Sequence, residues 1–433
     1  MRGGEKPVKR RAVGRTVVTV AALPFLMIAG SLVAPGPAGA ATAVRGVTPT
    51  EVKVVGICPI TSPTGGYPGC DVGAKARFAA VNRAGGINGR KIDYIGTGND
   101  TENGATNLAL AQKAVGQQKV FAVVPELGEG FLPASSDYLN ANKVPSVGWG
   151  FMPGQCSGPQ TYGFGFNGCV VPPKPTVVNT SVAAPVVNKL GKNKAYALIS
   201  DNTQVSTSGL TLVKDAFLDV GANVVYSEAN VPTTANVNYT PFVEALMTSN
   251  HGQPPDVIVT NGQFSNTVGL SAGLRAAGYK GALVNYIAYV PGLLTGSPDV
   301  AKALAGAYVE TQFLATEFGG SAIKQMKANI KAVDPKAPIL LGTALSYWSA
   351  DVFVQMLKAA GRNFTAASFG KTINGGWTYK PSGNPIPLGP VSYPADHSQA
   401  TPCADLVQIS GTSYVPVTPM KCYKNVPITK TPK

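Results

Sequence analysis

Short runs of apolar, often β-branched residues alternate with longer amphipathic segments along most of this chain. Residues 52–57 form the first such run, and the segment 72–84 that follows places Val72, Ala76 and Ala80 on one face of a helix. The same succession predicts further strands at 91–95, 120–124 and 145–148 and further helices at 105–115 and 131–141. Repeated strand–helix units of this kind predict a parallel sheet with helices on both faces.

The pattern restarts after a stretch rich in Gly and Pro at 162–175, which predicts a crossover between two lobes rather than a strand inside one. The second run predicts helices at 176–190, 209–220, 241–249 and 267–277 and strands at 195–200, 223–226, 257–260 and 282–287. Residues 309–314 and 375–394 are predicted to cross back, and 346–360 to add a long helix.

These two runs predict an α/β fold of two doubly wound parallel-sheet lobes joined by a multi-strand hinge. The first lobe is predicted to contain 41–168 and 312–372. The second lobe is predicted to contain 169–311 and 373–433, including the C-terminal tail. A chain of 433 residues is too long for one ordinary core, and several crossovers would make a hinge about which the lobes move.

The segment 1–40 has the three parts of a secretory signal peptide. Six Lys and Arg residues against one acid precede an apolar run at 17–33, and 35–40 ends in small residues at positions −3 and −1 of a cut after Ala40. The apolar run is interrupted by Pro24 and Gly30 and is short for a membrane anchor. The sequence therefore predicts an extracytoplasmic or secreted protein, cleaved near Ala40.

The charge of the chain is basic but scattered. The full sequence has 36 Lys and Arg against 22 Asp and Glu, a net charge of +14. Cleavage after Ala40 removes six of those bases and one acid and leaves +9. Because no run alternates basic and aromatic residues, nucleic-acid binding is not expected.

Six cysteines in an exported chain are expected to be oxidised. They fall into three local pairs, Cys58 with Cys70, Cys156 with Cys169 and Cys403 with Cys422. Six cysteines allow 15 connectivities, of which local pairing is the simplest. No two cysteines have the spacing of a zinc site, so neither a metal nor a cofactor is predicted.

The segment from Gly85 to Arg90 reads Gly-Gly-Ile-Asn-Gly-Arg and follows the first predicted helix. Together with that helix and the loop 59–66, it resembles the branched-chain amino-acid-binding (Leu/Ile/Val-binding) subgroup of type I periplasmic binding proteins. Segments 274–279 and 346–351 are similar as well, and the resemblance extends from about Thr48 to Pro390. It implies a monomeric protein that captures a small solute between two lobes and presents it to the permease of an ABC importer.

Ligands of doubly wound sheets bind beyond the carboxyl ends of the strands. The loops at those ends supply the candidate ligand-binding residues Thr64, Tyr67, Glu126, Leu127, Gly128, Trp149, Gly150, Phe151, Asn202, Gln204, Gln263, Phe264 and Tyr289. Glu126 and Glu129 in one loop would repel a carboxylate, and they could accept hydrogen bonds from hydroxyl, amide or ammonium groups. The sequence thus favours a small polar or cationic solute with an apolar part over a branched-chain amino acid.

Two motifs suggest catalysis but lack its context. Residues 269–273 match the Gly-x-Ser-x-Gly pattern of hydrolases, yet Ser271 is expected in mid-helix and not at a sharp strand-to-helix turn. Residues 163–168 match the dinucleotide pattern Gly-x-Gly-x-x-Gly, but they lead into Cys169 and three prolines and open no helix. No catalytic residue is predicted.

The leading hypothesis is therefore a non-enzymatic binding protein for an amino acid, amide or related small solute. A ligand sensor for a membrane receptor or kinase would need only the same closing cleft and stays open as an alternative. A secreted hydrolase built on Ser271 is a more distant one.

Overall fold

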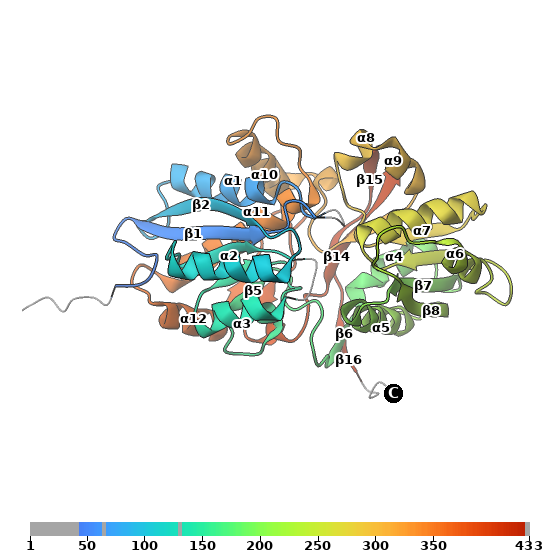
Figure 1. Cartoon of the computed structure of the whole chain (residues 1–433), viewed down its shortest axis with the longest axis horizontal. Helices are drawn as coiled ribbons and strands as arrows, with labels where there is room; N and C mark the ends of the chain where they lie inside the picture. The colour runs from blue at the N-terminus through green and yellow to red at the C-terminus, as the bar shows by residue number, and fades with distance from the viewer. Residues whose placement is uncertain (1–42, 63–65, 129–131, 429–433) are drawn as a thin grey trace, which may run out of the picture. The chain divides into compact units, whose positions relative to one another are not determined.

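The N-terminal strands of the chain form a five-stranded parallel sheet (Figure 1). The computed structural model describes residues 43–62, 66–128 and 132–428. The strands of this sheet are β1 (Glu51–Cys58), β2 (Lys91–Asn99), β3 (Ala122–Glu126), β4 (Ser146–Gly148) and β5 (Gly163–Gly165). They lie in the order β2-β1-β3-β4-β5, and every neighbouring pair is parallel.

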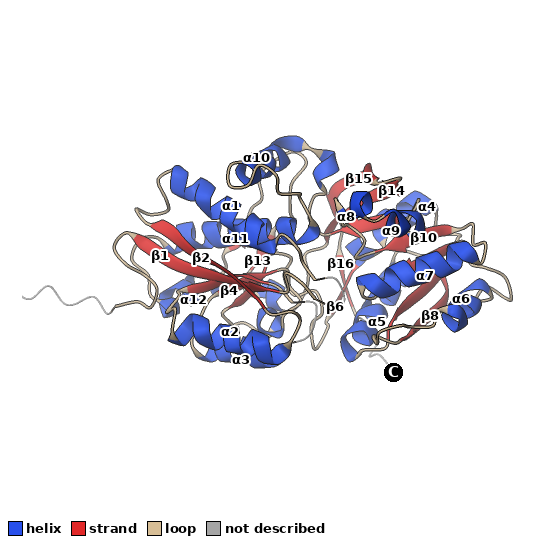
Figure 2. Ribbon diagram, turned by 45° about the horizontal axis from the view of Figure 1, so that its top comes forward, coloured by secondary structure: helices blue, strands red, loops and turns tan. Residues whose placement is uncertain are grey.

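Helices cover both faces of this first sheet, as Figure 2 shows. The helices around it are α1 (Cys70–Arg83), α2 (Gly104–Gly116), α3 (Pro133–Ala141), α10 (Gly320–Lys331), α11 (Leu341–Ala360) and α12 (Ala366–Asn374). Alternate residues of a strand point to opposite faces. Val54 therefore belongs to the core cluster that includes α1 and α11, whereas Val55 belongs to the cluster that includes α2 and α3.

The second sheet has seven strands in the order β15-β14-β11-β10-β9-β7-β8. Its strands are β7 (Ala195–Asp201), β8 (Asn223–Val231), β9 (Val257–Thr260), β10 (Ala282–Asn285), β11 (Tyr308–Thr311), β14 (Cys403–Ser410) and β15 (Ser413–Cys422). The strands from β7 to β11 pair in parallel, and the hairpin of β14 and β15 adds two antiparallel strands at one edge. The predicted α/β fold with parallel sheets is therefore confirmed, while the sequence pattern did not predict this edge hairpin.

The helices of the second part are α4 (Ala184–Leu190), α5 (Gln204–Asp219), α6 (Thr240–Met247), α7 (Phe264–Ala276), α8 (Leu293–Gly296) and α9 (Pro298–Ala303). The remaining short elements are the pair β6 (Val177–Asn179) with β16 (Asn425–Pro427), the pair β12 (Thr378–Tyr379) with β13 (Val391–Ser392), and the 3-10 turns η1 (Pro153–Cys156), η2 (Thr180–Val182), η3 (Thr316–Phe318) and η4 (Ala395–His397).

The turn after α1 explains the Gly-Gly-Ile-Asn-Gly-Arg motif. Ile87 and Arg90 exchange two backbone hydrogen bonds of 2.7 and 2.9 Å, which reverses the chain between α1 and β2. Gly86 has a φ of +87°, and a Cβ there would meet the Arg90 carbonyl oxygen at 2.1 Å. Only glycine fits at this position.

Two expected elements differ from the structure. The helix predicted at 176–190 begins only at Ala184, because Val177 and Val178 pair with the C-terminal strand β16 and Pro185 suits the first turn of a helix. The stretch 162–175 does not consist of crossover alone, because Gly163–Gly165 forms the edge strand of the first sheet.

Three chain segments meet between the two sheets. The Asn167 side-chain amide donates to Gln312 Oε1 at 2.5 Å, and the Thr401 hydroxyl donates to Asn167 Oδ1. Residues 309–311 are the end of β11, and Gln312 directly follows that strand. Residues 312–314 then leave the second sheet toward the first. These contacts tie 165–168, 312–314 and 399–401 together as the described part of a hinge.

The lobe boundaries inferred from sequence stay a prediction. Contacts of residues 374–397 favour assigning this segment to the first lobe. Asn374 donates to the Thr161 carbonyl, Tyr393 donates to Gly165, and His397 contacts the Gln155 carbonyl. Residues 374–397 therefore pack on the first sheet, although the sequence pattern had assigned them to the second lobe.

All six cysteines form the three local disulfides expected, Cys58–Cys70, Cys156–Cys169 and Cys403–Cys422. Each closes a loop of 12 to 19 residues, worth about 3 kcal/mol in the chain-entropy model. Among the described residues, no helix combines the length and the apolar character needed to cross a membrane.

Candidate ligand-binding cleft

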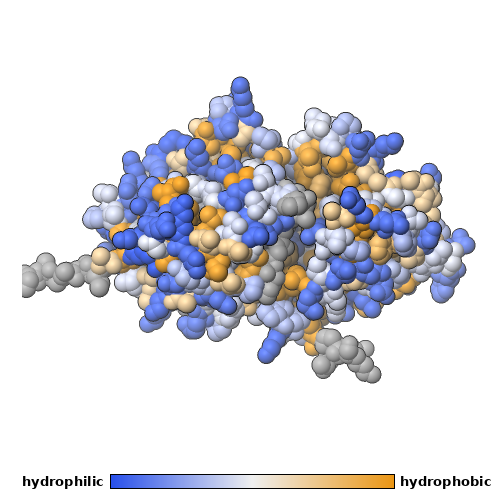
Figure 3. All heavy atoms as spheres, in the orientation of Figure 1, coloured by the Kyte–Doolittle hydropathy of each residue, from blue (hydrophilic) through white to orange (hydrophobic). Residues whose placement is uncertain are grey.

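The carboxyl ends of strands from both sheets open onto one cleft, with about 1510 Å³ of empty space, open solvent included. Loops after β3 and β4 of the first sheet line it, as do loops after β7, β9, β10 and β11 of the second. Figure 3 shows orange hydrophobic residues reaching the surface beside the hollow between the two parts of the molecule. This is the position at which doubly wound sheets bind ligands.

The cleft brings together seven of the residues proposed from sequence. These are Tyr67, Gly128, Trp149, Phe151, Gln263, Phe264 and Tyr289. Leu127 and Gly150 lie beside lining residues but do not themselves line the cleft, and Asn202 and Gln204 are exposed outside it. Thr64 and Glu129 fall outside the described residues.

Glu126, the residue on which the expected ligand chemistry depended, does not line the cleft. Its side chain is 1% exposed and accepts a hydrogen bond of 3.4 Å from Gln155 Nε2. Burial raises its pKa to about 7. As the last residue of β3, Glu126 packs inside the first lobe, and strand-end position alone could not show on which side of the sheet it lies.

Aromatic rings dominate the side of the cleft nearest the first sheet. Trp149 packs edge-on against Phe151 at 4.9 Å between ring centroids and against Tyr67 at 6.4 Å. The indole Nε1 donates to Gln312 Oε1 at 3.2 Å, so the ring is held by a residue of the hinge. Such rings offer flat apolar contact to a ligand.

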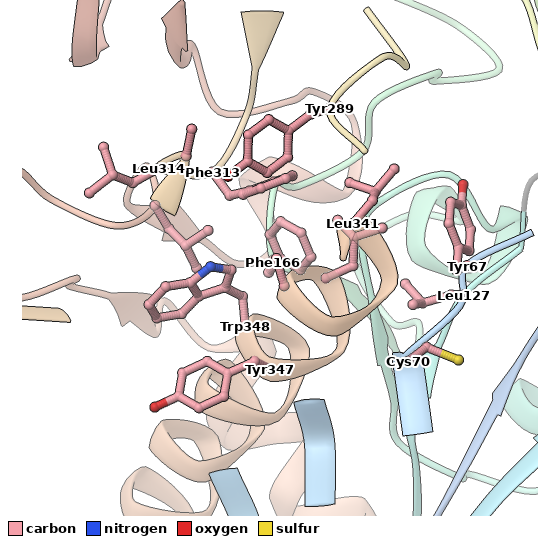
Figure 4. Packing of buried hydrophobic residues seen from close by; sticks show 14 of the residues in the cluster. Tyr67, Cys70, Leu127, Phe166, Tyr289, Phe313, Leu314, Leu341, Tyr347 and Trp348 are labelled. Carbon is pink, nitrogen blue, oxygen red and sulfur yellow. The ribbon is translucent and has the colours of Figure 1, made fainter. Parts of the chain in front are cut away.

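Tyr289 follows β10 of the second sheet and also lines the cleft. It is 1% exposed, donates its hydroxyl hydrogen to Glu317 at 2.7 Å and accepts a hydrogen bond from the Thr316 amide. Figure 4 shows its ring next to Phe313, with Leu341 from the start of α11 beside them. Tyr289 therefore presents an apolar ring edge to the cleft, because its hydroxyl group already has partners.

Asp201 ties three parts of the second lobe together at the end of β7. Its carboxylate oxygens accept hydrogen bonds of 2.7 Å from the Gln263 amide and from Asn266 Nδ2. Burial raises its pKa. Gly262 lets the loop approach, since a Cβ there would lie 2.4 Å from Asp201 Oδ1.

Much of the lining escaped the sequence analysis. The missed residues come from the hinge, from β6 and η2, from the inner face of α5, from the loop after β10 and from β11, and they include Val170, Val177, Asn179, Val182, Val205, Ser206, Gly209, Leu212, Val213, Tyr286, Glu310 and Gln312. Because 176–190 was predicted as one helix, nothing in the sequence pattern placed Val177 and Val182 beside α5. An acid within the apolar strand Tyr308–Thr311 was the one signal that could have singled out Glu310.

The lining has a distinctive charge. The described residues that line the cleft include Asp201 and Glu310 but no Lys or Arg. The acidic side chains of this described lining therefore stand among apolar and aromatic residues without a basic one.

The serine of the Gly-x-Ser-x-Gly motif does not have the geometry of a catalytic nucleophile. Ser271 is fully buried in the middle of α7, and its hydroxyl accepts a hydrogen bond of 3.5 Å from Asn285 Nδ2. In hydrolases with this motif, the catalytic histidine follows the serine along the chain, and His397 is the histidine in that position. Its ring contacts Gln155 and Asn374. The strand-to-helix turn that exposes a nucleophile is absent at this serine.

Several solved structures that share this fold are described as substrate-binding or solute-binding proteins. A fatty acid ABC transporter substrate-binding protein from Thermomonospora curvata is 17% identical over 88% of this chain and 95% of its own, with a TM-score of 0.67. A solute-binding protein of an ABC transporter from R. palustris, in complex with 4-hydroxybenzoate, is 19% identical over 87% of this chain and 98% of its own, with a TM-score of 0.64. A leucine-, isoleucine-, valine-, threonine- and alanine-binding protein from Brucella ovis, in a closed conformation, is 16% identical over 87% and 96%, with a TM-score of 0.67.

These likenesses establish the fold, and the sequence itself establishes the family. No curated protein sequence matches the chain. A family model described as periplasmic binding protein matches residues 51–413, which span both sheets and the hinge. With the type I fold and the cleft between its sheets, the chain belongs to the periplasmic binding protein family.

Proposed function

We propose that this protein captures one small solute in the cleft outside the cytoplasmic membrane and presents it to the permease of an ABC importer. One observation carries the proposal: the carboxyl ends of both sheets converge on a single cleft lined by apolar and aromatic residues. Residues from both sides of the hinge line this cleft, so a bound solute would stabilise one arrangement of the lobes by differential affinity.

Three further features support an extracytoplasmic binding role. The segment 1–40 has the composition of a signal peptide, and all six cysteines are paired in disulfides, which persist in oxidising compartments. Several structures of the same fold are described as parts of ABC transporters. The serine of the hydrolase motif is buried in a helix, so binding without chemistry is the function that fits the site. We further propose that the protein acts as a monomer.

A thermal-shift screen tests this function. The panel contains amino acids, fatty acids, aromatic acids, and aromatic alcohols and amines, each added to the mature chain. A specific solute at a hundredfold excess over its Kd is expected to stabilise the fold by about 2.7 kcal/mol. If no member of so broad a panel raises the melting temperature, the binding function is contradicted.

A further inference from the structure

The cleft continues from the space between the sheets into the second lobe. Val205, Gly209 and Val213 on the inner face of α5 line this extension, and Val177 and Val182 line its other side. Each of these residues is apolar. The polar residues beside them, Asn179 and Ser206, already make side-chain hydrogen bonds within the protein, so the extension suits an apolar body.

Glu310 is the acid of this apolar extension. Its strand, β11, lies in the middle of the second sheet, and Tyr308, two residues earlier, packs against the cluster that contains Leu210 and Val213 of α5. Since side chains at positions i and i+2 of a strand share a face, Glu310 points toward the same side as Tyr308. Glu310 itself lines the cleft and is only 3% exposed.

No protein group in the described part of the chain satisfies the Glu310 carboxyl group fully. Its Oε1 is buried without a hydrogen-bond partner. The nearby Tyr286 hydroxyl cannot serve, because it donates to the Val182 carbonyl oxygen at 2.5 Å. Burial and the neighbouring Asp405 carboxyl group raise the Glu310 pKa well above its ordinary value. A buried polar atom without a partner is costly, and a ligand that supplied a donor would remove this cost.

The charge of the lining decides which ligands can supply that donor. Asp201 is already held by Gln263 and Asn266, so Glu310 is the acid left for a ligand to contact. A carboxylate ligand would leave water for a cleft whose described lining has no Lys or Arg to offset its charge, and it could bond to Glu310 only by sharing that group's proton.

We propose that Glu310 selects the solute: the cleft binds a molecule with an apolar body whose polar end donates hydrogen bonds, and it discriminates against carboxylates. This inference rests on the proposed binding function. Both a hydroxyl and an ammonium group supply the required donor chemistry, and the two are distinguished by the test.

Three probes with one apolar body test the selectivity: 4-phenylbutylamine, 4-phenyl-1-butanol and 4-phenylbutyrate, each titrated calorimetrically into the mature chain. We expect the amine or the alcohol to bind at least tenfold more tightly than the carboxylate. If the amine binds most tightly, the cleft prefers an ammonium group, and if the alcohol binds most tightly, it prefers a neutral hydroxyl group. Tightest binding of 4-phenylbutyrate, or binding of none of the three, overturns the selectivity. The binding function itself would then be decided by the broad thermal-shift panel.

The variant Glu310→Gln links the selectivity to this residue. Its amide offers a donor to a carboxylate without sharing a proton and cannot ionise to pair with an ammonium group, so the preference for amine or alcohol over carboxylate should fall at least tenfold. Glu126→Gln is the matched control, because Glu126 is another strand glutamate with a buried, unpartnered Oε1 but lies outside the cleft lining. An unchanged preference in Glu310→Gln, or an equal change in Glu126→Gln, contradicts the assignment.

Discussion

Three carboxyl groups, those of Glu126, Glu310 and Asp405, are buried in strands of the two sheets and differ in their surroundings. Glu126 accepts a hydrogen bond from Gln155 within the first lobe, whereas Glu310 faces the cleft with one oxygen unpartnered. Asp405 accepts a hydrogen bond of 2.7 Å from the Ala315 amide and lies 2.5 Å from the Thr311 hydroxyl. The carboxyl groups of Glu126 and Asp405 thus bond within the protein core. The carboxyl group of Glu310 belongs to a residue that lines the cleft.

Asp405 should make the stability of the protein depend on pH. Burial raises its pKa to about 8, above the ordinary value of 3.8. A group whose pKa is raised by folding stabilises the fold fully below its ordinary pKa, and this contribution is lost as the pH rises through the raised value. Between pH 5 and 8, the free energy of unfolding should therefore fall by up to about 1.4 kcal/mol per pH unit on account of Asp405.

The variant Asp405→Asn isolates that contribution. An asparagine can accept from Ala315 and donate to Thr311 at every pH, so the variant should lose less stability than the wild type between pH 5 and 8. Denaturant titrations at several pH values measure the difference, to which Glu126 contributes equally in both proteins. Loss of the Asp405 charge also lowers the pKa of Glu310, which changes the pH dependence of stability in the same direction. Parallel pH profiles of variant and wild type would contradict the raised pKa of Asp405.

At the scale of elements, α5 both completes the second lobe and forms one wall of the cleft. Leu210, Val213 and Phe217 pack against the sheet, while Gly209 lies in the middle of the helix and lines the cleft. A Cβ added at Gly209 would meet only Asn261 Nδ2, at 3.7 Å. The glycine therefore leaves space that the fold does not need.

Gly209→Leu should fill the cleft without destabilising the protein. Leucine favours a helix over glycine by about 0.5–1 kcal/mol, and its side chain would extend into the space beneath α5. The affinity for the strongest solute of the screen should fall at least tenfold, measured by calorimetry, while the melting temperature is retained.

Gly116→Leu is the control for this change, because Gly116 ends α2 on the exposed surface and an added Cβ there meets no atom within 4 Å. The control should bind as the wild type does. Wild-type affinity in Gly209→Leu would show that the solute does not occupy the space beneath α5.

Elements with strong periodicity were predictable from the sequence, and those defined by distant partners were not. The alternation of apolar strands and amphipathic helices predicted β1 to β4 and α1 to α3 with shifts of only a few residues at their ends. The strand β6 escaped prediction because its partner β16 lies near the C-terminus, far along the chain. The antiparallel hairpin of β14 and β15 escaped because the preceding pattern was one of parallel units.

At the scale of the whole molecule, the cleft could be located from sequence but its chemistry could not. Trp149, Phe151 and Tyr289 were proposed from strand ends and do line the cleft, since parallel strands share one carboxyl edge. Strand ends misplaced Glu126, and they missed Glu310, which lies within the strand β11 and not in a loop at a strand end. A preference for ligands other than carboxylates was expected on account of Glu126 and Glu129, and we propose it instead on account of Glu310.

The central claim is that one solute molecule binds in the cleft and is released without chemical change. A calorimetric titration of the strongest solute of the screen, followed by mass spectrometry of the solute released on denaturation, tests it most directly. The account predicts one bound molecule per chain, recovered at its original mass. A stoichiometry far from one, or a released molecule of altered mass, would contradict it.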